Sequence, residues 1–281
     1  VVGVLISGWA SNSKWSLFGG MRAAAQVVSY EIPAGLVILV PIFMAGSLNL
    51  HQIIRAQGGM PWDWFMFQTP MGYAAFFILF TSLLAEGNRT PFDLPEAESE
   101  LVAGYNTEYS GMRFGLFFLA EWGNLWVMSA LMTTLFLGGW QVPWVSNATL
   151  SAWEAAGTVH EHWYYFWSTV FFAIKTLGLV FVVIWIRWTF PRIRVDQMMS
   201  LCWKYLVPAG MVIVVLTALT EWGSFEIFGD SALTQAPLGS VRGVLHGIFF
   251  AVAGLLPLVI FLRKTFANIR IAGDRVDLSN W

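Results

Sequence analysis

Residues 163–186, WYYFWSTVFFAIKTLGLVFVVIWI, carry one charged side chain, Lys175, in an otherwise apolar run. A helix of this length covers about 36 Å, which exceeds the roughly 30 Å of hydrocarbon in a bilayer. The run therefore predicts a transmembrane helix, and this decides the class of the fold. The composition agrees, because 57% of the chain is apolar and 11% is charged, whereas soluble domains are roughly 25% charged.

Five other apolar runs are long enough to cross a bilayer, so we predict six full spans, at residues 32–48, 64–85, 112–138, 163–186, 205–220 and 243–262. Residues 1–10 are apolar but only half a span long, so we expect a partial first helix and a chain that begins inside it. Residues 19–30 predict a short interfacial helix. No repeat or low-complexity linker divides the chain. The predicted fold is an all-α, polytopic transmembrane helix bundle forming a single domain, residues 1–281.

A polar loop rich in carboxylates lies within residues 84–122, LAEGNRTPFDLPEAESELVAGYNTEYSGMRFGLFFLAEW. Charges are costly in a bilayer, so this loop predicts proton transfer, binding of a polar headgroup or docking of a partner. Asp93 and Glu96 have the spacing of an N-cap and its partner, which predicts a short helix from Leu94 to Ala103. Crowded, poorly solvated carboxylates cannot all stay ionised, so some of their pKa values should rise toward neutrality, which a proton relay requires. The alternative is an acidic helix exposed to solvent. The carboxylates are Glu86, Asp93, Glu96, Glu98, Glu100, Glu108 and Glu121.

The distribution of Lys and Arg predicts the orientation, because basic residues concentrate in cytoplasmic loops. Of the 15 basic residues, Arg55 and Arg242 fall on one side and Lys175 falls inside a span. The acidic loop shares its side with the other twelve and is therefore predicted to be cytoplasmic in a multi-pass protein of the inner (plasma) membrane. These twelve are Lys14, Arg22, Arg89, Arg113, Arg187, Arg192, Arg194, Lys204, Arg263, Lys264, Arg270 and Arg275.

Composition also limits the chemistry of the chain. Cys202 is the single cysteine, so an internal disulfide is excluded, and an iron–sulfur cluster, which takes about four ligands, must lie in another chain. A haem held by two histidines is excluded because only His246 lies inside a predicted span. We predict no metal or cofactor site in this chain. The net charge of -2, without a dense basic cluster, indicates no nucleic-acid partner.

Several sequence blocks together resemble a known family. They are EGNRTPFDLPEAESELVAGY (86–105), TEYSG (107–111), FFLAE (117–121), GWASN (8–12) and RAAAQVVSYE (22–31), followed by Lys175-Thr176, Arg187, Pro191-Arg192, Arg194, Asp196-Gln197 and Trp203-Lys204. In this order they resemble the H subunit of the proton-pumping NADH:quinone oxidoreductase, respiratory complex I, whose mitochondrial counterpart is NADH dehydrogenase subunit 1. The resemblance covers residues 1–220, without the first two helices of the family. Residues 221–281, with a further span and a tail, go beyond this core.

The resemblance implies a membrane-arm subunit that forms part of the quinone chamber and couples quinone reduction to proton translocation. Quinone is then the substrate, the partners are the other membrane-arm and peripheral-arm subunits, and flavin and iron–sulfur clusters belong to those partners. The chain is part of an enzyme but is not catalytic alone. The implied proton-relay residues are Glu31, Glu86, Asp93, Glu96, Glu98, Glu100, Glu108, Glu121 and Lys175, and the implied quinone contacts are Arg22, Arg89, Phe92, Glu96 and Glu108.

Alternatives remain at this point. Lys175 lies in the middle of a span, which predicts a relay or an internal ion pair with Glu121 rather than a lipid-facing side chain. Arg187, Arg192 and Arg194 are interpreted as topology anchors or partner contacts. The alternative function is the corresponding membrane subunit of a membrane-bound hydrogenase or formate hydrogenlyase. A secondary transporter is a third class, and the absence of paired inverted repeats argues against it.

Overall fold

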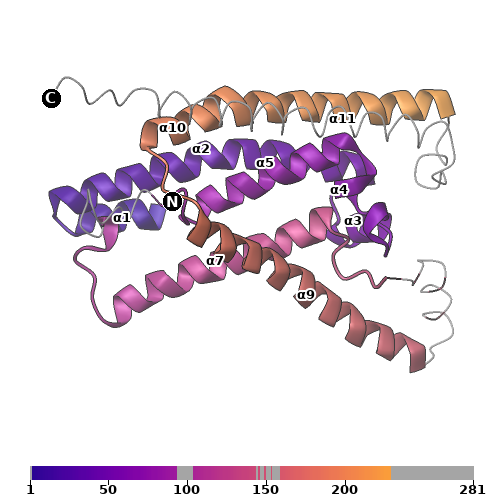
Figure 1. Ribbon diagram of the computed structural model, residues 1–281, viewed down its shortest axis with the longest axis horizontal. Coiled ribbons are helices and arrows are strands. Elements are labelled where there is room, and N and C mark those ends of the chain that lie inside the picture. The colour runs from indigo at the N-terminus through magenta and orange to yellow at the C-terminus, as the bar shows by residue number, and fades with distance from the viewer. Residues whose placement is uncertain are drawn as a thin grey trace, which may run out of the picture.

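The computed structural model describes residues 2–93, 104–143 and 159–228, together with residues 145, 149 and 153; within 159–228 it describes side chains only for residues 162–221. All regular structure in these ranges is helical (Figure 1). Four helical segments there are long and apolar enough to cross a membrane: α2 (Lys14–Ala45), α7 (Met112–Phe136), the part His162–Thr189 of α9 (Val159–Thr189), and Val195–Glu221. The last segment comprises α10 (Val195–Leu201), a π-helical turn (Cys202–Leu206) and most of α11 (Val207–Phe228).

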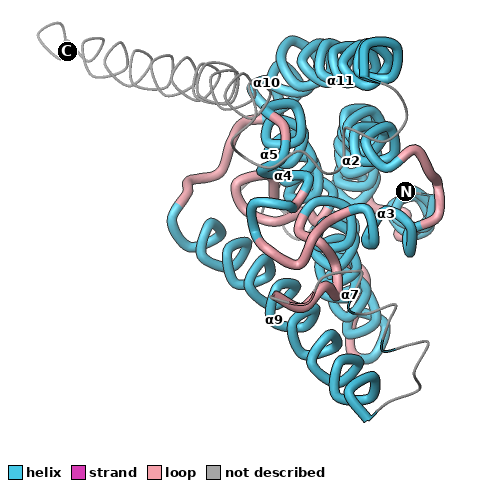
Figure 2. The backbone as a smooth tube through the Cα atoms, turned by 90° about the vertical axis from the view of Figure 1, so that its right-hand side faces the viewer, coloured by secondary structure: helices cyan, strands magenta, loops and turns pink. Residues whose placement is uncertain are grey.

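The long helices form a bundle with α2 and α5 (Pro70–Glu86) in the middle. In Figure 1, α2, α5 and α11 run side by side, while α7 and α9 cross below them. Figure 2 shows α11 and α9 at opposite edges of the bundle. Shorter elements close the ends: α1 (Val2–Ala10) and η2 (Gly104–Asn106) pack on α2, and α3 (Leu50–Ala56), η1 (Pro61–Asp63) and α4 (Phe65–Gln68) precede α5.

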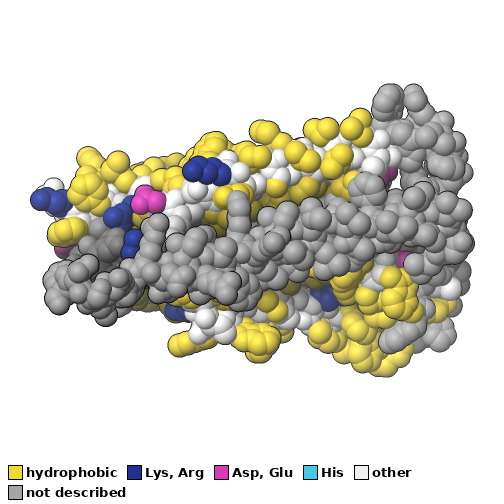
Figure 3. All heavy atoms as spheres, turned by 45° about the horizontal axis from the view of Figure 1, so that its top comes forward, with side chains coloured by type: hydrophobic (Ala, Val, Ile, Leu, Met, Phe, Trp, Pro, Cys, Tyr) yellow, Lys and Arg dark blue, Asp and Glu magenta, His cyan; other side chains and the backbone are white. Residues whose placement is uncertain are grey.

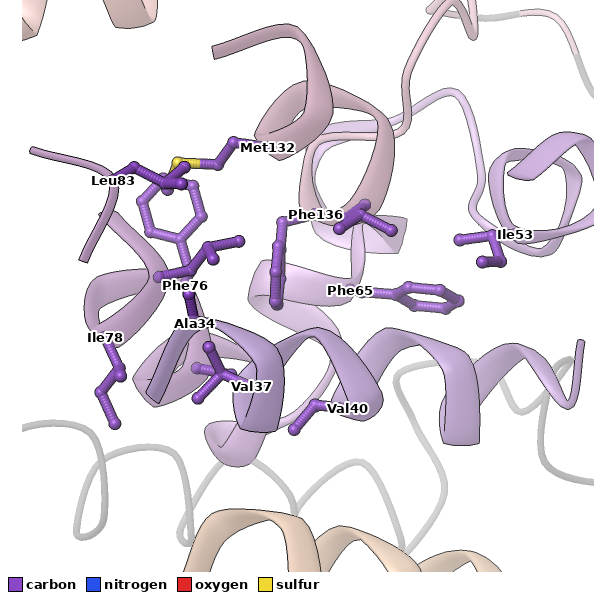
Figure 4. Packing of buried hydrophobic residues seen from close by; sticks show 13 residues of the cluster. Ala34, Val37, Val40, Ile53, Phe65, Phe76, Ile78, Leu83, Met132 and Phe136 are labelled. Atoms are coloured by element: carbon purple, nitrogen blue, oxygen red, sulfur yellow. The ribbon is translucent and has the colours of Figure 1, made fainter. Parts of the chain in front are cut away.

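Side chains from α2, α5 and α7 meet in the main hydrophobic core (Figure 4). Val37 and Val40 of α2 are fully buried there, and Phe76 of α5 meets Phe136 of α7 edge to face, with ring centres 6.0 Å apart. Such close packing holds transmembrane helices together because the surrounding lipid is as apolar as the core. Hydrophobic side chains also cover much of the described surface in Figure 3, as expected for helices that face lipid or other subunits.

The predicted interfacial helix at residues 19–30 is wrong, because these residues belong to the continuous helix α2. Gly19, the first residue of that predicted helix, permits a close contact between α2 and η2. A Cβ atom at Gly19 would lie 2.7 Å from the Cα atom of Gly104, closer than real contacts allow. The helix ends at Ala45 and is capped by Gly46, whose left-handed backbone (φ 64°) lets its N–H bond to the carbonyl of Ile42.

The predicted span at 64–85 is interrupted, and the count of six full spans is not confirmed. Thr69 accepts a hydrogen bond from the N–H of Gly72 at 3.0 Å and caps a new helix, which Pro70 begins. The resulting α5 has 17 residues and covers only about 26 Å. The predicted spans at 112–138, 163–186 and 205–220 correspond to α7, α9 and α11, whereas the span at 243–262 lies outside the described residues.

Candidate functional site

The more buried of the described ion pairs joins Arg89, in the loop after α5, to Glu121 in the first half of α7. The Nη2 atom of Arg89 lies 3.7 Å from Oε2 of Glu121, and the two side chains are 7% and 14% exposed. Either charge alone would be costly to remove from water, so each offsets the other. The separation exceeds the roughly 2.7–3.2 Å of a hydrogen bond. The contact is therefore electrostatic rather than a short, directional bond.

Two aromatic side chains also contact this pair. The hydroxyl of Tyr105, in η2, donates a hydrogen bond to Oε1 of Glu121 at 2.9 Å. The guanidinium carbon of Arg89 lies 4.5 Å from the centre of the Trp122 ring, within the range of a cation–π contact. Each oxygen of Glu121 thus faces a different partner. An enclosed ionisable group in a membrane helix is by default a candidate functional residue.

A second ion pair connects the same loop to the segment between α9 and α10. The Nη2 atom of Arg192 lies 3.5 Å from Oδ2 of Asp93, and the N–H of Ile193 donates to the carbonyl of Pro91 at 3.0 Å. Burial raises the pKa of Asp93 above its usual range, while the positive charge of Arg192 opposes this rise. Asp93 can therefore hold a proton more readily than an exposed aspartate does.

The two ion pairs form one electrostatic unit. The charge of Arg89 acts on both Asp93 and Glu121, and the charge of Asp93 acts on Glu121. Both described ends of the acidic loop belong to this unit, because Asp93 precedes residues 94–103 and Tyr105 follows them. We call the unit the carboxylate–arginine cluster; it comprises Arg89, Asp93, Tyr105, Glu121, Trp122 and Arg192.

Helix α2 holds the loop that carries Arg89 and Asp93. The side-chain amide of Gln26, which is fully buried, donates to the carbonyls of Ala85 at 2.6 Å and Phe92 at 2.7 Å. Tyr30, one turn further along α2, packs its ring against Phe92 with centres 5.6 Å apart and donates its hydroxyl to the carbonyl of Met198 at 3.0 Å. These contacts place the loop between α2 and α10, so the cluster rests on helices rather than on a free loop.

The other sequence-predicted residues lie in different surroundings. Glu31 is exposed on α2 and Glu86 is half-buried at the end of α5, close enough for their negative charges to repel. Arg22 is partly buried on α2, and Phe92 is buried. Glu108 is exposed just after η2, and so it lies outside the buried cluster.

Three predicted relay residues cannot be placed. Glu96, Glu98 and Glu100, together with the helix predicted from Leu94 to Ala103, lie outside the described residues. Of the nine predicted relay residues, the structure therefore brings Asp93 and Glu121 into one cluster with Arg89, and brings Glu31 near Glu86.

The predicted ion pair between Lys175 and Glu121 is wrong. Glu121 pairs with Arg89, and the Nζ atom of Lys175 instead donates to the carbonyls of Leu137 at 2.9 Å, Gly139 at 3.1 Å and Gln141 at 3.4 Å. Sixteen residues separate Glu121 from Leu137, which corresponds to about 24 Å along a helix. Lys175 thus lies near the other end of α7, where an ammonium group stabilises the free carbonyls and the negative end of the helix dipole.

The region around Lys175 is a separate group of hydrogen-bonded polar side chains. The Nζ atom lies 4.6 Å from the centre of the Trp64 ring. The buried amide of Gln57 accepts from the N–H of Gly138 at 2.8 Å, and that of Gln141 donates to the carbonyls of Ile54 and Gln57, both at 2.8 Å. These bonds fasten α3 to the end of α7. The described geometry here is that of a structural cap.

Sequence reasoning missed Tyr105, Trp122 and Gln26. Tyr105 and Trp122 occur in the quoted motifs, but an aromatic residue gives no indication of which charged group its hydroxyl or ring will meet. Gln26 gave a clearer signal, because a buried amide in an apolar helix must find hydrogen-bond partners. Arg192 was interpreted as an anchor or a partner contact; the structure gives it an ion pair with Asp93.

Comparison with known proteins found a matching family model and several similar proteins. A family model described as NADH dehydrogenase matches residues 1–218, which include the carboxylate–arginine cluster and Lys175. The H subunit of the NADH-quinone oxidoreductase of Anaeromyxobacter dehalogenans is 55% identical over 284 aligned residues, covering all of this chain and 66% of the relative.

Two other relatives match a shorter part of the chain. The H subunit of the NADH-quinone oxidoreductase of Chlorobaculum tepidum is 49% identical over 223 residues, 78% of this chain and 60% of the relative. The NADH-quinone oxidoreductase subunit 8 of Rhodothermus marinus is 48% identical over 222 residues, 78% of this chain and 63% of the relative. The chain therefore spans less than two thirds of the length of these three relatives.

Proposed function

Because the chain belongs to the NADH dehydrogenase family, we propose that it is the membrane-arm subunit of a proton-translocating NADH:quinone oxidoreductase. It forms part of the quinone-binding chamber and couples quinone reduction to proton translocation. The relatives are named as subunits of NADH-quinone oxidoreductase, so the proposal follows their names rather than the hydrogenase alternative.

The single observation that carries the coupling role is the carboxylate–arginine cluster at the two ends of the acidic loop. Asp93 and Glu121 share the charge of Arg89 in surroundings with little water. A proton that binds to one of these carboxylates changes the electrostatic energy of the other, because unit charges interact strongly in a low dielectric. A charge change at bound quinone would act on the same groups. This is the physical basis for coupling electron transfer to proton movement.

The proposed roles divide between proton transfer and quinone binding. The proposed relay consists of Glu31, Glu86, Asp93, Glu96, Glu98, Glu100, Glu108 and Glu121, with Lys175 as a further protonatable group beyond them. The proposed quinone contacts are Arg22, Arg89, Phe92, Glu96 and Glu108. Flavin and iron–sulfur clusters belong to partner subunits, because a single cysteine cannot supply the ligands of a cluster. The acidic loop lies on the cytoplasmic side of the plasma membrane.

The test is E121Q in a host whose complete enzyme contains this chain. Gln keeps the size of the side chain but cannot carry a proton. Quinone reductase activity and proton pumping should both fall at least about tenfold, since a positioned proton-transfer group contributes a factor of roughly 100 or more. The matched control is D196N, which neutralises an exposed carboxylate in the first turn of α10 and should leave both rates unchanged.

NADH oxidation by an artificial acceptor, which bypasses the membrane arm, measures assembly in the same membranes. It should be unchanged in E121Q and D196N. Full quinone reductase activity and full pumping in E121Q, with the enzyme assembled, would refute the coupling role. A loss of the artificial-acceptor reaction in E121Q would show instead that Glu121 is needed for assembly.

A further inference from the structure

Tyr105 is held firmly beside Glu121. Its side chain is only 2% exposed, and its ring packs edge to face on Phe117 with centres 5.8 Å apart. Its main-chain carbonyl accepts a hydrogen bond from the hydroxyl of Ser16 on α2 at 3.3 Å. The preceding residue, Gly104, lies directly against Gly19 of α2. The hydroxyl of Tyr105 is therefore fixed by contacts with two transmembrane helices, α2 and α7.

This fixed hydroxyl determines how the carboxylate of Glu121 is turned. Tyr105 donates to Oε1 at 2.9 Å, which leaves Oε2 directed toward Arg89 at 3.7 Å. A carboxylate on a glutamate side chain would otherwise rotate freely, because the last torsion of Glu has a broad energy profile. Arg89 alone cannot fix the rotation, since its contact is longer than a hydrogen bond and its guanidinium also lies on the Trp122 ring.

We propose that Tyr105 is a positioning residue for proton transfer at Glu121: its hydroxyl occupies Oε1 and presents Oε2, on the Arg89 side, as the oxygen that takes and releases the proton. The inference rests on the proposed function, in which Glu121 carries a proton. One proton adds to Oε2 and one negative charge disappears there. Tyr105 only donates a hydrogen bond and keeps its own proton throughout.

Within the part of the chain that the structure describes, charged and titratable groups act on Glu121 from three places. Tyr105 faces it from η2, Arg89 and Asp93 from the loop after α5, and Arg187 acts on it from the end of α9. Arg89, Asp93 and Arg187 act through their charge. Among these groups only Tyr105 forms a short hydrogen bond to the carboxylate, so removing its hydroxyl changes the orientation of Glu121 without changing the net charge.

The chain offers a matched control in Tyr109. Its ring packs on the same Phe117, with centres 5.1 Å apart, but its hydroxyl donates to the main-chain carbonyl of Ser7 at 3.3 Å. Y105F and Y109F therefore each remove one hydroxyl and keep one ring on Phe117. Only Y105F removes the hydrogen bond to Glu121.

The experiment uses the complete enzyme and compares Y105F, Y109F, E121Q and the double variant Y105F/E121Q. Infrared difference spectra between oxidised and reduced enzyme report carboxyl groups that gain or lose a proton. A carboxyl band present in the wild type should vanish in E121Q, shift to higher frequency in Y105F and stay in place in Y109F. Quinone reductase activity should fall roughly tenfold in Y105F, the effect of losing one hydrogen bond to a charged group. Y105F/E121Q should be no slower than E121Q, because Tyr105 acts through Glu121.

The outcomes separate this inference from the proposed function. A band that vanishes in E121Q but does not move in Y105F overturns the positioning role alone. If no band vanishes in E121Q, Glu121 takes no proton, and both the positioning role of Tyr105 and the proposed coupling role of Glu121 fail. An additive loss in Y105F/E121Q would assign Tyr105 a role independent of Glu121 and also overturn the inference. If Y105F does not assemble, replacing Tyr105 by 3-fluorotyrosine keeps the shape and strengthens the donor; the band should then shift to lower frequency, and an unmoved band overturns the inference.

Discussion

The side-chain amide of Gln26 lies 2.7 Å from the carbonyl oxygen of Phe92, so helix α2 directly holds the loop that carries Arg89 and Asp93. The same amide nitrogen bonds the carbonyl of Ala85, at the end of α5. One buried side chain thus fixes both sides of the turn. The geometry of the carboxylate–arginine cluster depends on α2, although no member of the cluster belongs to that helix.

The first prediction concerns this contact. Q26L keeps the volume of the side chain but removes the amide that donates to the carbonyls of Ala85 and Phe92. The free energy of unfolding should fall by about 1–3 kcal/mol, measured as a lower unfolding temperature of the purified enzyme. Q52L, at an exposed position of α3, is the control and should change little. An unchanged unfolding temperature in Q26L would show that the amide does not hold the loop.

The second prediction concerns Lys175 as the cap of α7. K175M keeps the length of the side chain and removes the charge, so the carbonyls of Leu137 and Gly139 lose their donor. Thermal unfolding should show a destabilisation of about 2–3 kcal/mol, typical of hydrogen bonds to a charged group. Normal thermal stability in K175M would contradict the cap, and lost proton pumping in the same variant would support the proposed role of Lys175 as a protonatable group.

The third prediction follows from the raised pKa of Asp93. A folded chain that keeps this proton more readily than the unfolded chain gains stability below the unfolded pKa of about 3.9 and loses it as the pH rises through the raised value. The contribution of Asp93 to the stability of the wild-type enzyme should therefore fall as the pH is raised from about 4. D93N cannot ionise and should lose less over the same range. The measurement is the unfolding temperature of both proteins across this pH range. Parallel curves for the wild type and D93N would contradict a contribution from the raised pKa of Asp93.

The fourth prediction concerns orientation. Ser110 is exposed after η2, and Leu48 is 81% exposed between α2 and α3. S110C should react with a membrane-impermeant thiol reagent only from the cytoplasmic side, and L48C only from the other side. Cys202 is fully buried and should not react in the unmodified chain, which serves as the background. Reversed labelling would overturn the orientation given by the basic residues.

Much of the described fold could be predicted from the sequence where apolar runs are long and uninterrupted. The spans predicted at 112–138 and 163–186 agree with α7 and α9 to within a few residues. The errors arose at small residues and at Pro, because these residues occur both where a helix begins or ends and within an apolar helical run. Residues 19–30 were expected to form a separate interfacial helix but are part of α2, and Pro70 lies in an apolar run yet begins a new helix.

The sequence indicated which charged residues belong to the candidate site but not which partner each of them contacts. Asp93 and Glu121 could be singled out because charge near a membrane is costly, whereas Arg89 was singled out by the family resemblance. The partner of Lys175 could not, because it bonds main-chain carbonyls, which every residue has. The position of Tyr105 depends on the contact between α2 and η2, and no local pattern in the sequence encodes that contact.

Arg89 and Lys175 contact α7 at two separate points and restrain its position along its axis. Arg89 contacts it through Glu121 in its first half, and Lys175 donates to the carbonyls just beyond its end. Sliding α7 by a single residue would move it about 1.5 Å along its axis, enough to break the hydrogen bonds to Lys175. A shift of α7 along its axis at Glu121 would therefore also disturb the hydrogen bonds that Lys175 donates to the carbonyls of Leu137 and Gly139.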